Sequence, residues 1–128
     1  MKHLKDEESF LVNENCVSCD VATPLAPDEI GELSELLEGG WNVVDGHHLS
    51  RTYRFPAFQE ALDFANRVGE IAEEEEHHPT ITVGWGMAEV VIFTRTINGL
   101  SRNDFILASK ISQIVRQAYE RHSYEATD

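Results

Sequence analysis

The sequence has few basic residues and no long apolar run, and each shortage excludes a class of protein. Lysine and arginine number 10 against 23 aspartates and glutamates, which gives a formal net charge of −13. Such an acidic chain is a poor partner for nucleic acid or for an anionic membrane surface, so we expect neither. The longest run of purely aliphatic and aromatic residues, Val90–Phe93, is far too short to cross a bilayer. Residues 1–8 lack an apolar stretch behind their lysines, so we expect no signal peptide and a cytoplasmic protein.

Cysteine is also scarce, since the chain holds only 2. Cys16 and Cys19 form one C-x-x-C, which is compatible with half a zinc site, a redox pair or no role. A zinc site would have to recruit the pair His47-His48 or the pair His77-His78. Adjacent histidines are poor tetrahedral ligands and the usual spacing between paired histidines is missing, so we expect no metal.

Composition along the chain predicts one folded domain with two loose ends. Residues 1–23 are polar and acidic without periodicity, and we expect a mobile tail there. Prolines then mark entry into a domain over residues 24–122. Residues 123–128 are expected to fray.

Apolar spacing and end signals predict the helices of this domain. The first runs from Pro27 to about Leu37, and two glycines stop it. The second runs from Pro56 to about Glu75. The last starts after Ser101, whose spacing to Asp104 fits a capping box.

Short alternating segments predict two β-hairpins. Residues 41–44 and 47–55 flank Asp45-Gly46, a strong two-residue hairpin signal. Residues 80–83 and 88–96 form the second pair. We therefore predict an α+β fold in the order α-β-β-α-β-β-α, with a four-stranded antiparallel sheet and three helices packed on one face. Apolar residues on both faces of the strands further predict an oligomer that covers the second face.

The sharpest chemical signal is His77-His78-Pro79, which follows four glutamates. Histidine titrates near neutrality, so an adjacent pair can supply an acid and a base. Pro79 pushes His78 toward extended geometry, so the pair sits where a helix ends and a strand begins. Such a boundary can aim two imidazoles into one cleft. The alternative is that the histidines only favour the helix C-terminus electrostatically.

Several motifs along the chain occur together in one protein family: Gly40-Trp41, Arg54-Phe55, Phe58, Phe64, His77-His78-Pro79, Gly99-Leu100-Ser101, Asp104 and Ala108. On these residues the chain from about Leu25 to Val115 resembles the pterin-4a-carbinolamine dehydratases, also called 4a-hydroxytetrahydrobiopterin dehydratases. The resemblance implies dehydration of a 4a-hydroxytetrahydropterin to the quinonoid dihydropterin, after aromatic amino acid hydroxylation. It also implies that the pterin is the substrate and that no metal or other cofactor is needed.

The resemblance also implies the site residues. His77 and His78 match two catalytic histidines, and Arg95 stands where the family has a third histidine. Arginine cannot act as a general base, but it can hydrogen-bond the pterin or the leaving oxygen, or pair with nearby glutamates. The expected substrate-binding residues are Glu76, Pro79, Trp85, Thr94 and Asp104.

Two other functions stay open. The first is a weak or inactive dehydratase-like protein that serves as an interaction or assembly module, as relatives do in transcription and in carboxylase assembly. The retained His77 and His78 argue against the carboxylase-assembly group. The second is a metal-dependent enzyme built on the histidine pairs. The expected partners are the pterin, a second or further copy of the chain in a homodimer or homotetramer, and an aromatic amino acid hydroxylase pathway.

Overall fold

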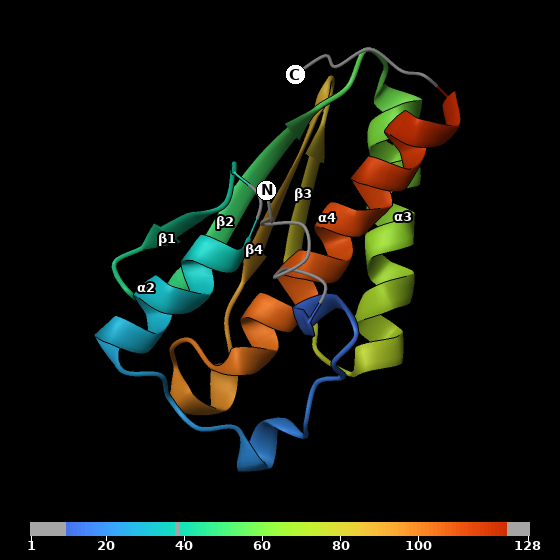
Figure 1. The fold of residues 1–128 in the computed structure, drawn as a ribbon. Coiled ribbons are helices and arrows are strands. Elements are labelled where there is room, and N and C mark those ends of the chain that lie inside the picture. Colours follow the sequence, from blue (N-terminus) through green and yellow to red (C-terminus); the bar gives the residue numbers. More distant parts are fainter. Residues whose placement is uncertain (1–9, 38, 123–128) are drawn as a thin grey trace.

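A computed structural model describes residues 10–37 and 39–122 of the chain, and Figure 1 shows their arrangement. The expected fraying of residues 123–128 lies outside the described residues. The helices are α2 (Pro27–Leu36), α3 (Phe58–Glu75) and α4 (Arg102–His122). The strands are β1 (Asn42–Val44), β2 (His48–Arg54), β3 (Thr80–Gly84) and β4 (Met87–Ile92), and the short 3-10 turns are η1 (Cys19–Val21) and η2 (Arg95–Ile97).

The strands form one four-stranded sheet in the order β1-β2-β4-β3. Every neighbouring pair is antiparallel, with Leu49 opposite Ile92 and Ile81 opposite Val90. The predicted α+β fold and its antiparallel sheet are confirmed. Among the described residues, no helix is long and apolar enough to span a membrane.

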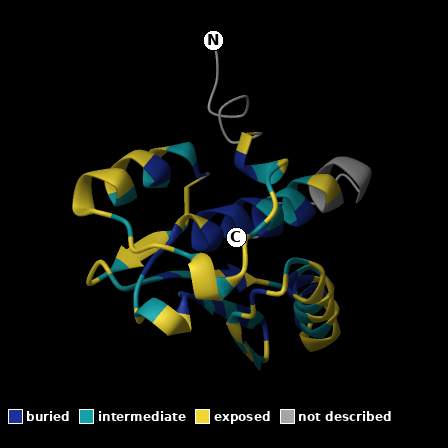
Figure 2. Ribbon diagram, turned by 90° about the horizontal axis from the view of Figure 1, so that it is seen from below, coloured by how far each residue is buried: buried dark blue, intermediate teal, exposed yellow. Residues whose placement is uncertain are grey.

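The core lies between one face of the sheet and the helices. Leu49 on β2 and Val90 and Ile92 on β4 are fully buried, and residues i and i+2 of a strand share a face. The same apolar cluster includes Leu33 of α2, Val68 of α3 and residues of α4 between Phe105 and Ile114. Figure 2 shows the buried residues concentrated on α4, while the outer surfaces of α2 and α3 are exposed. The helices therefore cover one face, as the sequence predicts.

The opposite face of the sheet is more polar than the sequence pattern suggested. Ser50, Val91 and Thr80 lie side by side on it, and Thr52, Glu89 and Thr82 form the next row. The expectation of apolar residues on both faces is met only in part: Val91 and Met87 lie on this face, but polar residues separate them. The expected oligomer stays a prediction, and the outer face of the sheet alone does not support it.

Two strand boundaries differ from the prediction. The first hairpin has a three-residue loop from Asp45 to His47, because Val44 pairs with His48. Asp45 and Gly46 both have positive φ, as the hairpin signal requires. Strand β4 ends at Ile92, so Arg95 lies in η2 and not on a strand. The strand stops there because the chain turns through η2 and Thr94 pairs with Gly99.

Residues 10–23 dock on the domain, so the expectation of a mobile tail is not met there. Leu11 is fully buried, the Val12 carbonyl accepts from Lys110 (2.7 Å), and Asn103 bonds both the N–H and the C=O of Val17 (2.9 Å each). In Figure 1 this blue segment crosses the end of α3 and the start of α4. Single hydrogen bonds to chain-distant partners leave no periodic pattern in the sequence, which is why composition alone did not reveal the docking.

A second anchor of this segment is electrostatic. Arg102 donates two hydrogen bonds to the carboxylate of Glu14, at 2.8 and 2.6 Å. The bond from Arg102 lowers the pKa of Glu14 below its ordinary value. A lowered carboxyl pKa stabilises the docked state above the usual titration range of glutamate, and the contribution fades as the pH falls through that range. The pair is partly exposed, so we expect this contribution to be small.

Helix α3 ends in a left-handed residue that redirects the chain. Glu76 has φ 56° and ψ 38°. The N–H of His77 donates to Ala72 and that of Glu76 to Glu73, which together form a Schellman end. Glycine usually occupies this position because a side chain strains the left-handed conformation. The turn sends His77 toward α4 and releases His78 and Pro79 into the approach to β3.

We predict opposite effects of glycine at two neighbouring glutamates. Glu76→Gly should raise the free energy of unfolding by about 0.5 kcal/mol, because relief of left-handed strain exceeds the added chain entropy. Glu74→Gly removes the same charge from a helical position and should lower it by about 1 kcal/mol. Urea unfolding measures both values. Equal losses would contradict the left-handed assignment at Glu76.

Candidate active site

The centre of the candidate site is a buried imidazole–carboxylate pair. The side chains of His77 and Asp104 are 3% and 0% exposed, and His77 Nε2 lies 2.6 Å from Asp104 Oδ1. His77 comes from the turn after α3, and Asp104 lies in the first turn of α4. A carboxylate only accepts hydrogen bonds, so the imidazole donates from Nε2. The neutral ring then keeps its lone pair on Nδ1.

The second oxygen of Asp104 caps helix α4. Asp104 Oδ2 accepts from the Ser101 N–H at 2.8 Å and from the Thr94 hydroxyl at 2.9 Å. Thr94 and Ser101 also share a hydrogen bond at 2.8 Å. The sequence left open whether Asp104 caps the helix or belongs to the site. The structure shows both contacts, because each oxygen serves one of them.

The docked N-terminal segment closes the other side of His77. Cys19 Sγ lies 3.7 Å from His77 Nδ1, and the carbonyl of Cys19 accepts from Thr96 at 2.9 Å. Cys16 lies nearby, where its N–H donates to Glu75 at 2.7 Å. Burial, reinforced by the charge of Glu75, raises the pKa of the Cys16 thiol to about 12. The residues of the C-x-x-C therefore border the buried histidine.

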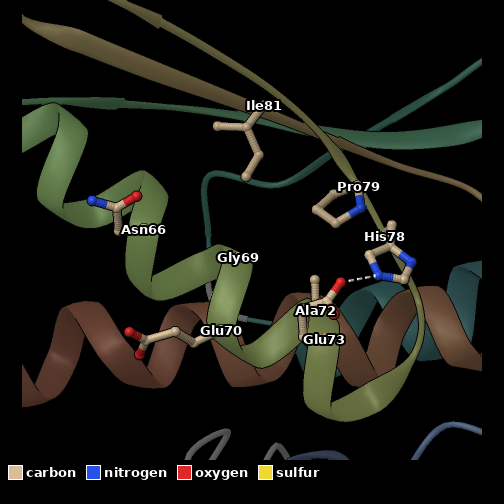
Figure 3. A pocket seen from close by; sticks show the side chains of 8 residues that line it. All are labelled: Asn66, Gly69, Glu70, Ala72, Glu73, His78, Pro79 and Ile81. Atoms are coloured by element: carbon tan, nitrogen blue, oxygen red, sulfur yellow. Dashed lines mark hydrogen bonds and ion pairs between the residues drawn. The ribbon is translucent and has the colours of Figure 1, made fainter.

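His78 faces solvent on the other side of the turn. Its side chain is 55% exposed and its Nε2 lies 2.7 Å from Glu73 Oε2. His78 lines an open pocket of about 580 Å³ between α3 and β3. Figure 3 shows Glu73 and His78 joined at one end of this pocket, with Pro79 and Ile81 on the strand side. The remaining lining residues are Asn66, Gly69, Glu70 and Ala72.

The two histidines thus point to different surroundings, not into one open cleft. His77 meets Asp104 and Cys19 inside the protein, whereas His78 meets Glu73 and the pocket. This divergence follows from their adjacency, because successive side chains of an extended segment point to opposite sides. Glu76 is exposed between α3 and the pair, and Pro79 lines the pocket.

Arg95 and Trp85 lie apart from this pair in the contacts of the described residues. Arg95 is exposed on η2, and its guanidinium sits 5.7 Å from the ring centroid of Phe93. No ion pair between Arg95 and a glutamate is found among the described side chains. Trp85 is 79% exposed in the turn after β3, and the whole of that strand separates it from His78.

Two participants escaped the sequence reasoning. Glu73 was only one of a run of glutamates, and the structure selects it as the partner of His78. Cys19 was considered with Cys16 as half a zinc site, a redox pair or a residue without a role, and a direct thiol–imidazole contact with His77 was not foreseen. Glu73 lies five residues before His78, close enough in sequence to have been considered as its partner, whereas no local pattern points to Cys19. No group of three or more potential metal ligands gathers within the part of the chain that the structure describes.

Comparisons with known proteins place these residues in a family context. The model of the family described as "Pterin 4 alpha carbinolamine dehydratase" matches residues 23–114. A protein of Rubrobacter xylanophilus named "Putative pterin-4-alpha-carbinolamine dehydratase" is 50% identical over 107 residues, covering 83% of this chain and 99% of that relative. A protein of the same name from Rickettsia canadensis is 46% identical over 104 residues, or 80% of this chain and 95% of the relative.

A solved structure gives the same fold. The chain is similar to the crystal structure of a transcriptional coactivator/pterin dehydratase from Brucella melitensis, with a TM-score of 0.67 and 29% identity. The match covers 72% of this chain and 98% of the other. The family model starts at residue 23, so it includes the two histidines and Asp104 but not the C-x-x-C.

We predict that Asp104 contributes far more to the free energy of unfolding than an ordinary helix cap does. Asp104→Ala leaves three buried donors without an acceptor and should lower the free energy of unfolding by about 3 kcal/mol. Glu29→Ala is the matched control, because exposed Glu29 accepts from the Ala26 N–H (2.8 Å) at the start of α2 without a histidine partner. That variant should lose no more than about 1 kcal/mol. Equal small losses in urea unfolding would contradict the buried network.

Proposed function

The chain belongs to the pterin 4 alpha carbinolamine dehydratase family, and we propose that it dehydrates a 4a-hydroxytetrahydropterin by histidine acid–base catalysis. The observation that carries this proposal is the pair of adjacent histidines, each with its own carboxylate. In the reaction the 4a-hydroxyl leaves with an added proton as water, while ring N5 gives up a proton. The product is the quinonoid dihydropterin, and no electrons are exchanged with the protein.

His78 is the proposed acid. It is exposed at a pocket of about 580 Å³, which is large enough for a bicyclic ring, and Glu73 faces its Nε2. The contact with Glu73 orients the ring at the edge of the pocket, where an imidazolium could hand its proton to a leaving hydroxyl. Pro79 and the α3 residues around Glu73 would hold the pterin against it.

His77 is the proposed base. Asp104 fixes the ring through Nε2 and would stabilise the imidazolium that forms when Nδ1 takes a proton. Thr94 and Ser101 in turn hold Asp104 in place. At 3% exposure His77 lies beneath the N-terminal segment, so the pterin reaches it only if Cys19 moves aside.

Arg95, Glu76 and Trp85 complete the set of predicted site residues. Arg95 is exposed next to buried Thr94 and can donate hydrogen bonds to a pterin carbonyl, but it cannot replace a histidine as base. Glu76 positions the histidines through its backbone turn. Trp85 lies at the far end of β3, and we assign it no role in a site formed by one copy of the chain. We further propose that pterin-dependent hydroxylation of an aromatic amino acid supplies the substrate and that the protein works as a homo-oligomer.

A second candidate function is a dehydratase-like interaction module. Two observations favour it: Arg95 stands at the third histidine position, and the N-terminal segment covers His77. The similar Brucella melitensis structure carries the name of a coactivator as well as a dehydratase. In that case the histidines would hold the fold and the pocket would bind without turnover.

Stopped-flow absorbance of freshly made 4a-hydroxytetrahydropterin tests the proposal. We predict acceleration by the protein, a loss of about 10²-fold or more in kcat/KM for His78→Ala, and a loss for His77→Ala. His48→Ala removes a histidine outside the site and should leave the rate unchanged. Arg95→His should raise the rate by restoring a group that titrates near neutrality.

Two results would overturn the proposal. Unchanged rates in both His77→Ala and His78→Ala would remove the histidines from the chemistry. No acceleration by folded wild-type protein would favour the interaction module instead.

A further inference from the structure

The two cysteines of the chain lie three residues apart in opposite chemical surroundings. Cys16 is partly buried against α3 and α4, where its Sγ lies 3.6 Å from the Asn103 carbonyl. Burial and the nearby carboxylate of Glu75 raise the pKa of this thiol to about 12. Cys16 therefore stays protonated at neutral pH and is a poor nucleophile.

Cys19 instead faces a nitrogen base. Its Sγ lies 3.7 Å from His77 Nδ1, on the opposite side of the ring from Asp104. Because Nε2 donates to the carboxylate at 2.6 Å, the neutral ring presents its lone pair to the thiol. The thiol, the imidazole and the carboxylate are then connected in sequence through the two ring nitrogens, which is the arrangement that activates cysteine in thiol enzymes.

Hydrogen bonds also hold the first and the last residue of this triad, Cys19 and Asp104, in place. Thr96 donates to the Cys19 carbonyl at 2.9 Å and the backbone of Val17 is held by Asn103, so η1 is anchored on either side of Cys19. Thr94 and the Ser101 N–H hold Asp104 at the other end. Cys19 is only half-buried, so a small reagent can reach its sulfur.

We propose that Cys19 is a reactive thiol, activated by His77 and Asp104, and that it is a modification site for small hydroperoxides. His77 Nδ1 takes the thiol proton, and the sulfur attacks one peroxide oxygen. The O–O bond breaks, the sulfur becomes a sulfenic acid, and the departing hydroxide or alkoxide takes the proton from His77 to leave as water or an alcohol. Sulfur is oxidised by two electrons and the peroxide is reduced by two.

This modification would act on the proposed dehydratase site, and this part of the inference rests on the proposed function. The oxygen added to Cys19 would lie beside Nδ1 of His77, the ring nitrogen that is not hydrogen-bonded to Asp104. A base blocked there cannot accept the pterin proton. Peroxide would thus switch the dehydratase off, and a thiol reductant would restore it.

Single-cysteine proteins separate the two thiols, since the chain has only 2 cysteines. Cys16→Ser leaves Cys19, and Cys19→Ser leaves Cys16. With iodoacetamide at neutral pH, the protein that keeps Cys19 should react at least about tenfold faster than the protein that keeps Cys16. With hydrogen peroxide and dimedone, mass spectrometry should find the sulfenic acid adduct on Cys19. Faster reaction at Cys16, or an adduct on Cys16 alone, would overturn the proposal.

Histidine variants test the activation itself. In the Cys16→Ser background, His77→Gln should slow alkylation of Cys19 about tenfold. His78→Gln is the matched control, because His78 contacts Glu73 and not Cys19, and it should leave alkylation unchanged. If His77→Gln fails to fold, the same Cys16→Ser protein in denaturing urea serves instead, and the thiol should react more slowly than in the native state. Activation by His77 would be contradicted if both histidine variants changed the alkylation rate equally, or if native Cys19 reacted no faster than the unfolded thiol.

These thiol measurements do not depend on pterin turnover. A reactive Cys19 in a protein without dehydration activity would sink the proposed function and keep the thiol site. Dehydration that survives complete oxidation of Cys19 would sink the regulatory link. An active dehydratase with two inert thiols would sink the inference alone.

Discussion

The candidate site depends on one buried carboxylate that serves two purposes. Asp104 uses Oδ2 to cap helix α4 and to hold Thr94, and Oδ1 to hold His77. A buried carboxylate is costly unless hydrogen bonds satisfy it, and here three donors do so. The start of α4, the segment that follows β4 and the turn after α3 are therefore fixed to one another at the position of the histidine.

Two consequences follow from this fixed point. The left-handed turn at Glu76 delivers His77 to Asp104, so adjacent His78 is left facing the pocket beside Glu73. The N-terminal segment then has a formed surface to dock on, and its cysteine meets the free nitrogen of His77. Structural support and chemistry are thus parts of one network, and a change in Asp104 would affect both.

The sequence could predict most elements and part of the site. Periodicity and end signals located the helices and both hairpins, because burial imposes them locally. The motif around His77-His78-Pro79 and Ser101 led to the family, which the comparisons confirm. The docking of residues 10–23, the choice of Glu73 and the contact of Cys19 could not be predicted, since they arise from single contacts between distant residues. The exit of Arg95 from the strand escaped for the same reason, because the turn at η2 depends on how Thr94 is held.

The most direct test of the central network is the protonation of the His77 ring. A long-range ¹H–¹⁵N NMR spectrum of the folded protein distinguishes the two ring nitrogens. We predict a proton on Nε2, in a hydrogen bond that Asp104→Asn alters. A bare Nε2 with the proton on Nδ1 would mean that Asp104 does not accept from His77, and both the base assignment and the activation of Cys19 would then be wrong.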